Sequence, residues 1–224
     1  MAKLDPPQAT LRFHVTRLLL LTGLACAPCS FAGTQAEEPL SASVQAALQK
    51  NVADTASPRA AFASEVEAKA WLEEMSQRLA SRIPDNQERI SFLKTVHYEA
   101  TRAGLQPELV LGLIQVESAF RKYALSPVRA KGYMQVMPFW VKLIGTADQN
   151  LFNLRTNLRY GCTIFRYYLD MERGNYFRAL GRYNGSLGQA DYPTMVVQTW
   201  ERVWTSATRR ADAKPVKTST GREG

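Results

Sequence analysis

Cysteine and histidine are scarce in this sequence. Its 224 residues include three cysteines and two histidines, and His14 lies in the N-terminal segment. Two histidines that are not accompanied by cysteines or acids at ligand spacing form no cluster that would hold a metal ion. We therefore expect no metal site and no other cofactor.

The sequence also lacks an apolar run long enough to cross a membrane. The longest candidate, Leu18–Ala25, is much shorter than the ~20 residues that a spanning helix needs. Basic residues precede it and Ser30-Phe31-Ala32 follows, which is typical of a secretory signal peptide with its cleavage site. We predict that residues 1–32 are a signal peptide, and that the protein is periplasmic with no stable membrane span.

Cysteine usage agrees with export. Cleavage after Ala32 would remove Cys26 and Cys29 and leave Cys162 alone, so that no internal disulfide could form. The aliphatic residue of Gly23-Leu24-Ala25-Cys26 stands one place too late for a lipoprotein signal, so we favour cleavage over lipid anchoring. Cys162 lies at helical spacing from Leu158, which predicts a core position.

Long runs of basic residues are missing from the part of the chain that would fold. The net charge of +8 favours an anionic partner, but the basic residues are scattered. A polyanionic cell wall accounts for this charge as well as a nucleic acid does, and we expect no nucleic-acid partner. The hydrophobic share of 46% and the charged share of 21% are those of an ordinary globular protein.

Alternating strand patterns and repeats of 20–50 residues are also lacking. Apolar residues at helical spacing, bounded by proline, glycine and capping residues, predict an all-α fold with a small irregular β-ribbon near residues 125–133. The predicted helices fall within 62–84, 85–104, 107–117, 138–145, 158–174, 177–183 and 193–204. His97 falls on the apolar stripe of the second and is expected in or near the core.

Composition divides the remainder of the chain. Residues 33–60 are rich in alanine, serine, glutamine and glutamate and predict a flexible leader. Residues 61–205 hold the helical pattern and predict one folded domain. Residues 206–224 are basic and polar and predict a disordered tail.

Glu117 is the most informative residue of the predicted domain. It follows Leu113 and Ile114 by one helical turn, on the apolar side of a helix and near its C-terminal end. Burial and the helix dipole both disfavour a negative charge there, which raises a carboxyl pKa and suits a general acid. A single glutamate at such a spacing is also compatible with an exposed helix face, so the companion motifs decide between the two readings.

Three separated motifs accompany this acid in a fixed order. Glu117-Ser118 is followed by Ser126, nine residues past Glu117, and by Gly132-Tyr133-Met134-Gln135-Val136-Met137-Pro138. Tyr183-Asn184-Gly185-Ser186 completes the pattern. From about Ala70 to Trp204 the chain therefore resembles the soluble lytic transglycosylase (SLT-domain) family, whose goose-type, lysozyme-like fold cuts the glycan strands of bacterial peptidoglycan. Arg129 and Gly185-Ser186 depart from the small residues and the Ala-Gly usual in that family.

The resemblance implies that the chain acts on the MurNAc–GlcNAc β-1,4 bond with one acid. Glu117 would protonate the glycosidic oxygen and would then, as a carboxylate, deprotonate the C6 hydroxyl of MurNAc. That hydroxyl attacks C1 and gives the 1,6-anhydro ring. A second carboxylate would not be needed, and neither Asp148 nor Asp170 stands out as one.

The resemblance also assigns supporting roles. Tyr183 would direct its hydroxyl toward Glu117. Ser126 and Gln135 would hydrogen-bond the sugar, and Met137 would form an apolar floor under it. Asn184 would bind substrate or hold the Asn-Gly turn, whereas Met134 is expected in the core.

Two alternatives to this function remain open from the sequence. A lysozyme-type hydrolase would use a bound water in place of the C6 hydroxyl. A non-catalytic scaffold would bind the cell wall through the same fold. A partner in the cell wall or in a secretion machinery is compatible with either, but the sequence identifies none.

Overall fold

The computed structural model describes residues 35, 37–53, 62 and 64–206. Within them the chain is helical, and the all-α prediction is confirmed. The elements are α1 (Ala42–Ala53), α2 (Glu65–Leu79), α3 (Asn86–Arg102), α4 (Pro107–Ser118), α5 (Phe139–Ile144), α6 (Leu154–Met171), α7 (Tyr176–Asn184), α8 (Asp191–Thr199) and a π-helical turn, η1 (Trp200–Trp204). None of the described helices is both long and apolar enough to cross a bilayer. The predicted signal peptide and nearly all of the predicted tail lie outside the described residues.

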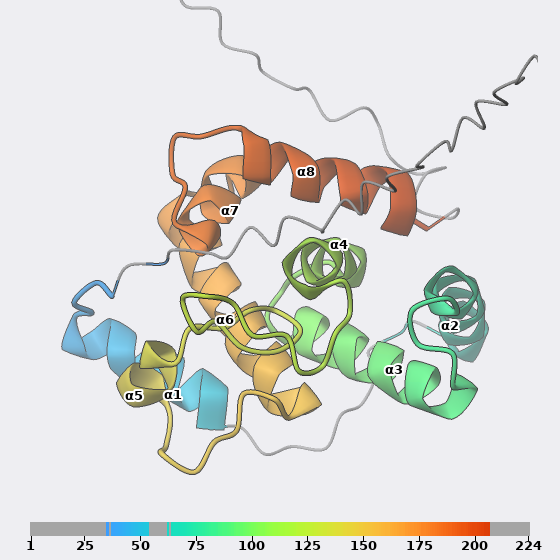
Figure 1. The fold of residues 1–224 in the computed structure, drawn as a ribbon, viewed down its shortest axis with the longest axis horizontal. Coiled ribbons are helices and arrows are strands. Elements are labelled where there is room, and N and C mark those ends of the chain that lie inside the picture. Colours follow the sequence, from blue (N-terminus) through green and yellow to red (C-terminus); the bar gives the residue numbers. More distant parts are fainter. Residues whose placement is uncertain (1–34, 36, 54–61, 63, 207–224) are drawn as a thin grey trace, which may run out of the picture.

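Helix α1 corrects the expectation of a flexible leader. It lies within residues 33–60 and packs against α5 and α6, at the left of the view in Figure 1. Leu48 and Val52, one helical turn apart, are buried in the same core as the rest of the chain. The residues around them are mostly small or polar, so the composition of the segment does not reveal this short apolar stripe.

Helix boundaries follow local signals in the sequence. Asp85 Oδ1 accepts a hydrogen bond from the backbone N–H of Glu88 at 2.6 Å, which caps α3 as predicted. Gly104, with a φ of +67°, follows the end of that helix, and Pro107 begins α4 in its first turn. Ser64 caps α2 in the same way as Asp85 caps α3.

Helix α4 is the central helix of the domain and lies between α3 and α8 in Figure 1. It is apolar on nearly all sides, as a helix enclosed by others must be. Gly112 permits its closest approach, since a Cβ there would lie 3.0 Å from Trp200 Cβ and 3.1 Å from Trp200 Cα. The residues of α4 with no exposed surface are Leu109, Val110, Leu111, Leu113 and Ile114.

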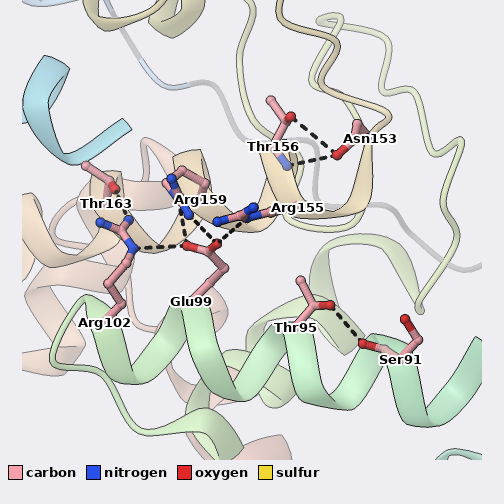
Figure 2. A network of polar contacts seen from close by, with 9 residues as sticks. All are labelled: Ser91, Thr95, Glu99, Arg102, Asn153, Arg155, Thr156, Arg159 and Thr163. Carbon is pink, nitrogen blue, oxygen red and sulfur yellow. Dashed lines mark hydrogen bonds and ion pairs between the residues drawn. The ribbon is translucent and has the colours of Figure 1, made fainter. Parts of the chain in front are cut away.

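A buried ion network joins α3 to α6 (Figure 2). Glu99 has no exposed surface, and Arg159 binds both of its carboxylate oxygens at 2.7 and 2.8 Å. Arg102 and Arg155 contact the same carboxylate at 3.1 and 3.4 Å. A buried carboxylate is tolerated only with such compensation, so this network fixes how the two helices pack.

Two side chains that could have been reactive lie in the core, as predicted. His97 is buried and stacks on Phe62 with ring centroids 3.7 Å apart, while Trp71 meets it edge-on at 5.1 Å. Cys162 has no exposed surface, and burial raises the pKa of its thiol far above the usual range. A thiol in that state is a poor nucleophile.

Candidate active site

Glu117 lies in the last turn of α4, and its side chain is buried with 5% of its surface exposed. Burial raises the pKa of this carboxyl from its ordinary value of 4.5 to about 8, against the opposing effect of a hydrogen bond from Tyr192. Glu117 is therefore predominantly protonated at neutral pH. The chain turns away directly after it, since Ala119 and Phe120 both adopt positive φ angles.

Tyr192, near the start of α8, is the direct partner of the acid. Its hydroxyl donates a short hydrogen bond to Glu117 Oε1. The phenol is buried, and burial together with the nearby Glu117 raises its pKa well above the usual value. The local sequence does not reveal this role, because a tyrosine beside a proline at the start of a helix gives no signal of a contact made 75 residues away.

Tyr183 was expected to direct its hydroxyl toward Glu117. This expectation is wrong, because the hydroxyl of Tyr183 forms its hydrogen bond elsewhere. The hydroxyl of Tyr183 donates to the backbone carbonyl of Met134 at 2.7 Å. Tyr183 still lies close enough to Glu117 for that carboxyl to raise its pKa, after the larger effect of burial. Through its bond to Met134, Tyr183 links α7 to the loop that carries Gln135.

Residues 119–138 connect α4 to α5 and form an irregular hairpin. Isolated antiparallel bridges pair Leu125 with Lys131 and Lys131 with Val136, which confirms the predicted ribbon. Ser126 Oγ accepts a hydrogen bond from the N–H of Ala130 at 2.9 Å, so this hydroxyl holds the turn of the hairpin.

Gln135 is buried within the same hairpin and has a positive φ of 47°. Its side-chain amide donates to the carbonyls of Ala124 and Gly132 at 3.2 and 2.9 Å. Both of its N–H groups therefore bind the protein, and any contact with a ligand would fall to its oxygen.

Asn157 of α6 fixes the hairpin against the helical core. Its Oδ1 accepts from the N–H of Met134, and its Nδ2 donates to the carbonyls of Lys131 and Leu151, each at 2.8 Å. Gly132, with a φ of +74°, allows this contact, because a Cβ there would lie 2.5 Å from Asn157 Nδ2. The role of Asn157 was not predicted, because in the local sequence it resembles any polar residue of a helix.

The remaining predicted site residues lie at the ends of α5 and α7. Met137 is partly exposed, just before α5, whereas Met134 is fully buried as expected. Asn184 ends α7 and precedes Gly185, whose φ of +77° closes the helix. Asn184 Nδ2 and Ser186 Oγ are buried and have no hydrogen-bond partner in the part of the chain that the structure describes.

Gln35 lies against the same region from the N-terminal side. Its side-chain amide donates to the carbonyl of Tyr183 and accepts from Trp140 Nε1, the latter at 2.8 Å. The carbonyl of Tyr183 belongs to the last turn of α7, where backbone acceptors lack a partner within the helix. Gln35 thereby satisfies two polar groups that are otherwise buried.

Asp148 and Asp170 each have partners outside this arrangement. Asp148 is on the surface, where a hydrogen bond from the hydroxyl of Thr146 lowers its pKa. Asp170 pairs with Arg166 on α6. Among the described residues no group of three or more histidines, cysteines or acids lies close enough together to hold a metal ion.

Comparison with known proteins identifies the class of this domain. Residues 94–194 match the family model of the transglycosylase SLT domain, a segment that includes Glu117, the hairpin and Tyr192. Over these residues the chain is similar to the SLT-domain family, as its motifs predicted.

Individual relatives match over shorter stretches. The chain is 49% identical over 47 residues to membrane-bound lytic murein transglycosylase C of Actinobacillus pleuropneumoniae serotype 5b (strain L20), covering 21% of this chain and 13% of that protein. It is 31% identical over 103 residues to a transglycosylase of Enterobacteria phage PRD1, covering 46% of this chain and 38% of that protein. The chain thus spans well under two thirds of these relatives.

A solved structure of an inactive mutant of lytic transglycosylase Slt from Pseudomonas aeruginosa also matches. The alignment covers 80% of this chain and 36% of that chain, with 20% identity and a TM-score of 0.40.

Proposed function

We propose that this chain is a peptidoglycan lytic transglycosylase that cleaves the MurNAc–GlcNAc β-1,4 bond with Glu117 as its single acid and base. The observation that carries the proposal is a buried carboxyl with a pKa of about 8 that is hydrogen-bonded by a buried tyrosine. A neutral carboxylic acid at pH 7 is the form that can donate a proton to a leaving oxygen. The match of residues 94–194 to the SLT-domain family model supports the choice of substrate.

In the first step Glu117 transfers its proton to the glycosidic oxygen, and the bond from that oxygen to C1 of MurNAc breaks. Tyr192 donates to Oε1, so Oε1 is the acceptor and the transferable proton resides on Oε2. The same phenol stabilises the negative charge that appears on Glu117 once the proton has left.

In the second step the Glu117 carboxylate removes the proton from the C6 hydroxyl of MurNAc while O6 forms a bond to C1. The product is 1,6-anhydroMurNAc, and Glu117 regains its proton. The nucleophile belongs to the sugar, so a second carboxylate and an activated water are both unnecessary.

A lysozyme-type hydrolase is the runner-up, since the same acid could act with a bound water. A non-catalytic wall-binding scaffold is a weaker candidate. Binding alone gives no reason to bury a carboxyl against Tyr192 at the cost of desolvating it.

Export and domain division belong to the same proposal. Residues 1–32 would direct the chain to the periplasm, where peptidoglycan is accessible, and residues 61–205 would form the catalytic domain. Helix α1, which packs on α5 and α6, would belong with that domain. Sequencing the N-terminus of the protein from a periplasmic fraction tests the export, and an intact Met1 would contradict it.

Digestion of purified sacculi tests the reaction itself. Wild type should release muropeptides that end in anhydroMurNAc, identified by mass spectrometry as one water lighter than reducing products. Reducing-end MurNAc would favour the hydrolase, and no release at all would favour the scaffold.

A further inference from the structure

Large apolar side chains are exposed on the hairpin that follows Glu117. Tyr123 is 71% exposed and Leu125 is 62% exposed. The ring of Tyr123 packs against the partly exposed ring of Phe152, with centroids 5.8 Å apart, so two segments distant in the sequence share one aromatic surface. Exposed apolar groups gathered in this way often mark a site that binds something.

Two cations belong to the same surface. Lys122 Nζ lies 5.2 Å from the ring centroid of Tyr123, and Lys131 Nζ lies 5.7 Å from that of Phe152. Leu125 is bridged directly to Lys131 across the hairpin, so these two side chains are neighbours on one face. We call this set, Lys122, Tyr123, Leu125, Lys131 and Phe152, the hairpin surface.

The charge of the surrounding sequence has one sign. Between Glu117 and Asp148 there is no acidic residue. The same stretch contains five basic residues: Arg121, Lys122, Arg129, Lys131 and Lys142. A ligand of this surface should therefore combine apolar groups with negative charge.

The hairpin surface adjoins the candidate active site through the backbone. Tyr123 and Leu125 flank Ala124, whose carbonyl accepts a hydrogen bond from the side chain of Gln135. Leu125 directly precedes Ser126. The exposed residues therefore lie on the same hairpin as Ser126 and Gln135, the two residues expected to hydrogen-bond the sugar.

We propose that the hairpin surface binds the carboxylate-bearing peptide stems of the glycan strand. This inference rests on the proposed function and adds a substrate contact outside the bond that is cleaved. Stem peptides carry free carboxylates, which can pair with Lys122 and Lys131. They also carry short aliphatic groups, which can pack on the rings of Tyr123 and Phe152. In a stem-bearing strand the sugars are uncharged, because the MurNAc carboxyl is bonded to the stem, so they offer no partner to the lysines. The positions of the lysines over the rings also leave less open aromatic face for sugar stacking.

The test measures binding of the full chain carrying Glu117→Gln, so that cleavage does not interfere. Fluorescently labelled soluble glycan strands are used with their stems intact or after an amidase has removed them. Lys122→Glu combined with Lys131→Glu should raise the Kd for stem-bearing strands about five- to twentyfold, by loss and reversal of charge contacts. The Kd for stem-free strands should change less than about twofold. Tyr123→Ala should weaken stem-bearing strands selectively as well.

The matched control is Lys50→Glu combined with Lys94→Glu, which makes the same charge change at exposed lysines of α1 and α3. It should leave both Kd values nearly unchanged. Equal weakening of stem-bearing and stem-free strands by the hairpin variant would overturn the proposal, because the lysines would then bind the glycan backbone, whose MurNAc carboxylates the amidase sets free, and not the stems. An equal effect of the control variant would overturn it too, in favour of general attraction to any polyanion.

Failure of this inference differs from failure of the proposed function. If wild type cleaves sacculi but the hairpin variant binds stem-bearing strands normally, only the inference is wrong. If wild type cleaves nothing, the proposed function is wrong, whereas selective binding of stems can still be measured.

Discussion

The hydroxyl of Tyr192 donates a hydrogen bond to Glu117 Oε1 in the core, where α4 packs against α8. Two effects act on the acid in opposite directions. Burial raises the pKa of Glu117, whereas the hydrogen bond from Tyr192 lowers it. Burial is the larger effect. The tyrosine therefore moderates the acid without ionising it, and it remains in place to stabilise the carboxylate that forms during reaction.

Tyr192→Phe should lower kcat about 10- to 100-fold, the value of a hydrogen bond to a charged group. It should also move the alkaline fall of activity to higher pH, since the pKa of Glu117 is no longer lowered. Tyr183→Phe is the matched control, because its hydroxyl binds the Met134 carbonyl. It should cost roughly 1–3 kcal/mol of stability and leave the pH profile in place. A shift of the profile by Tyr183→Phe alone would restore the role predicted for Tyr183 from the sequence.

The activity of wild type should fall as pH rises through about 8, because Glu117 loses the proton that it donates. The measurement is kcat/KM on soluble glycan strands between pH 5 and pH 10. A fall centred near pH 5 would show that Glu117 is ionised at neutral pH and acts in another way.

The stability of the fold should also depend on pH through the ionisation of Glu117. The folded pKa of Glu117 is raised above the unfolded value of 4.5, so its contribution is fully present below pH 4.5 and is lost as pH rises toward about 8. Glu117→Gln removes that dependence and preserves the acceptor for Tyr192. The variant should match wild type near pH 4 and should be more stable by roughly 3 kcal/mol at pH 7. Urea unfolding at both pH values measures this, and a variant less stable than wild type at pH 7 would contradict it.

Much of the framework around the acid was predictable because it depends on local signals. Asp85 caps α3, Pro107 begins α4, and the apolar spacing of Leu113, Ile114 and Glu117 places the carboxyl inward. Each signal lies within about one helical turn of the feature that it determines, so the sequence alone reveals it.

The contacts that complete the site were not predictable in this way. Tyr192 meets Glu117 across 75 residues, and Asn157 meets Met134 across 23. The local sequence around Tyr192 or Asn157 would be the same if the side chain faced solvent. Only the packing of the helices determines its partner. Helix α1 was missed for a related reason, since its two buried residues are embedded among small and polar ones.

The ion network between α3 and α6 should be essential to the fold. Glu99→Gln removes the charge that three arginines share and should cost roughly 3–5 kcal/mol, because buried Arg159 loses its charged partner. Asp170→Asn is the control, since it removes an exposed pair with Arg166 and should cost less than about 1 kcal/mol. Chemical unfolding of both variants tests this, and equal losses would show that burial of Glu99 has little consequence.

The central claim is that Glu117 acts alone and that the sugar supplies the nucleophile. The most direct test is digestion of sacculi by wild type in water enriched in heavy oxygen, with Glu117→Gln in parallel. Intramolecular attack by O6 takes no oxygen from solvent, so the products should be anhydroMurNAc muropeptides without label, and the variant should be slower by about 10²–10⁴-fold. Reducing-end products that carry one heavy oxygen would contradict the account, because water would then be the nucleophile.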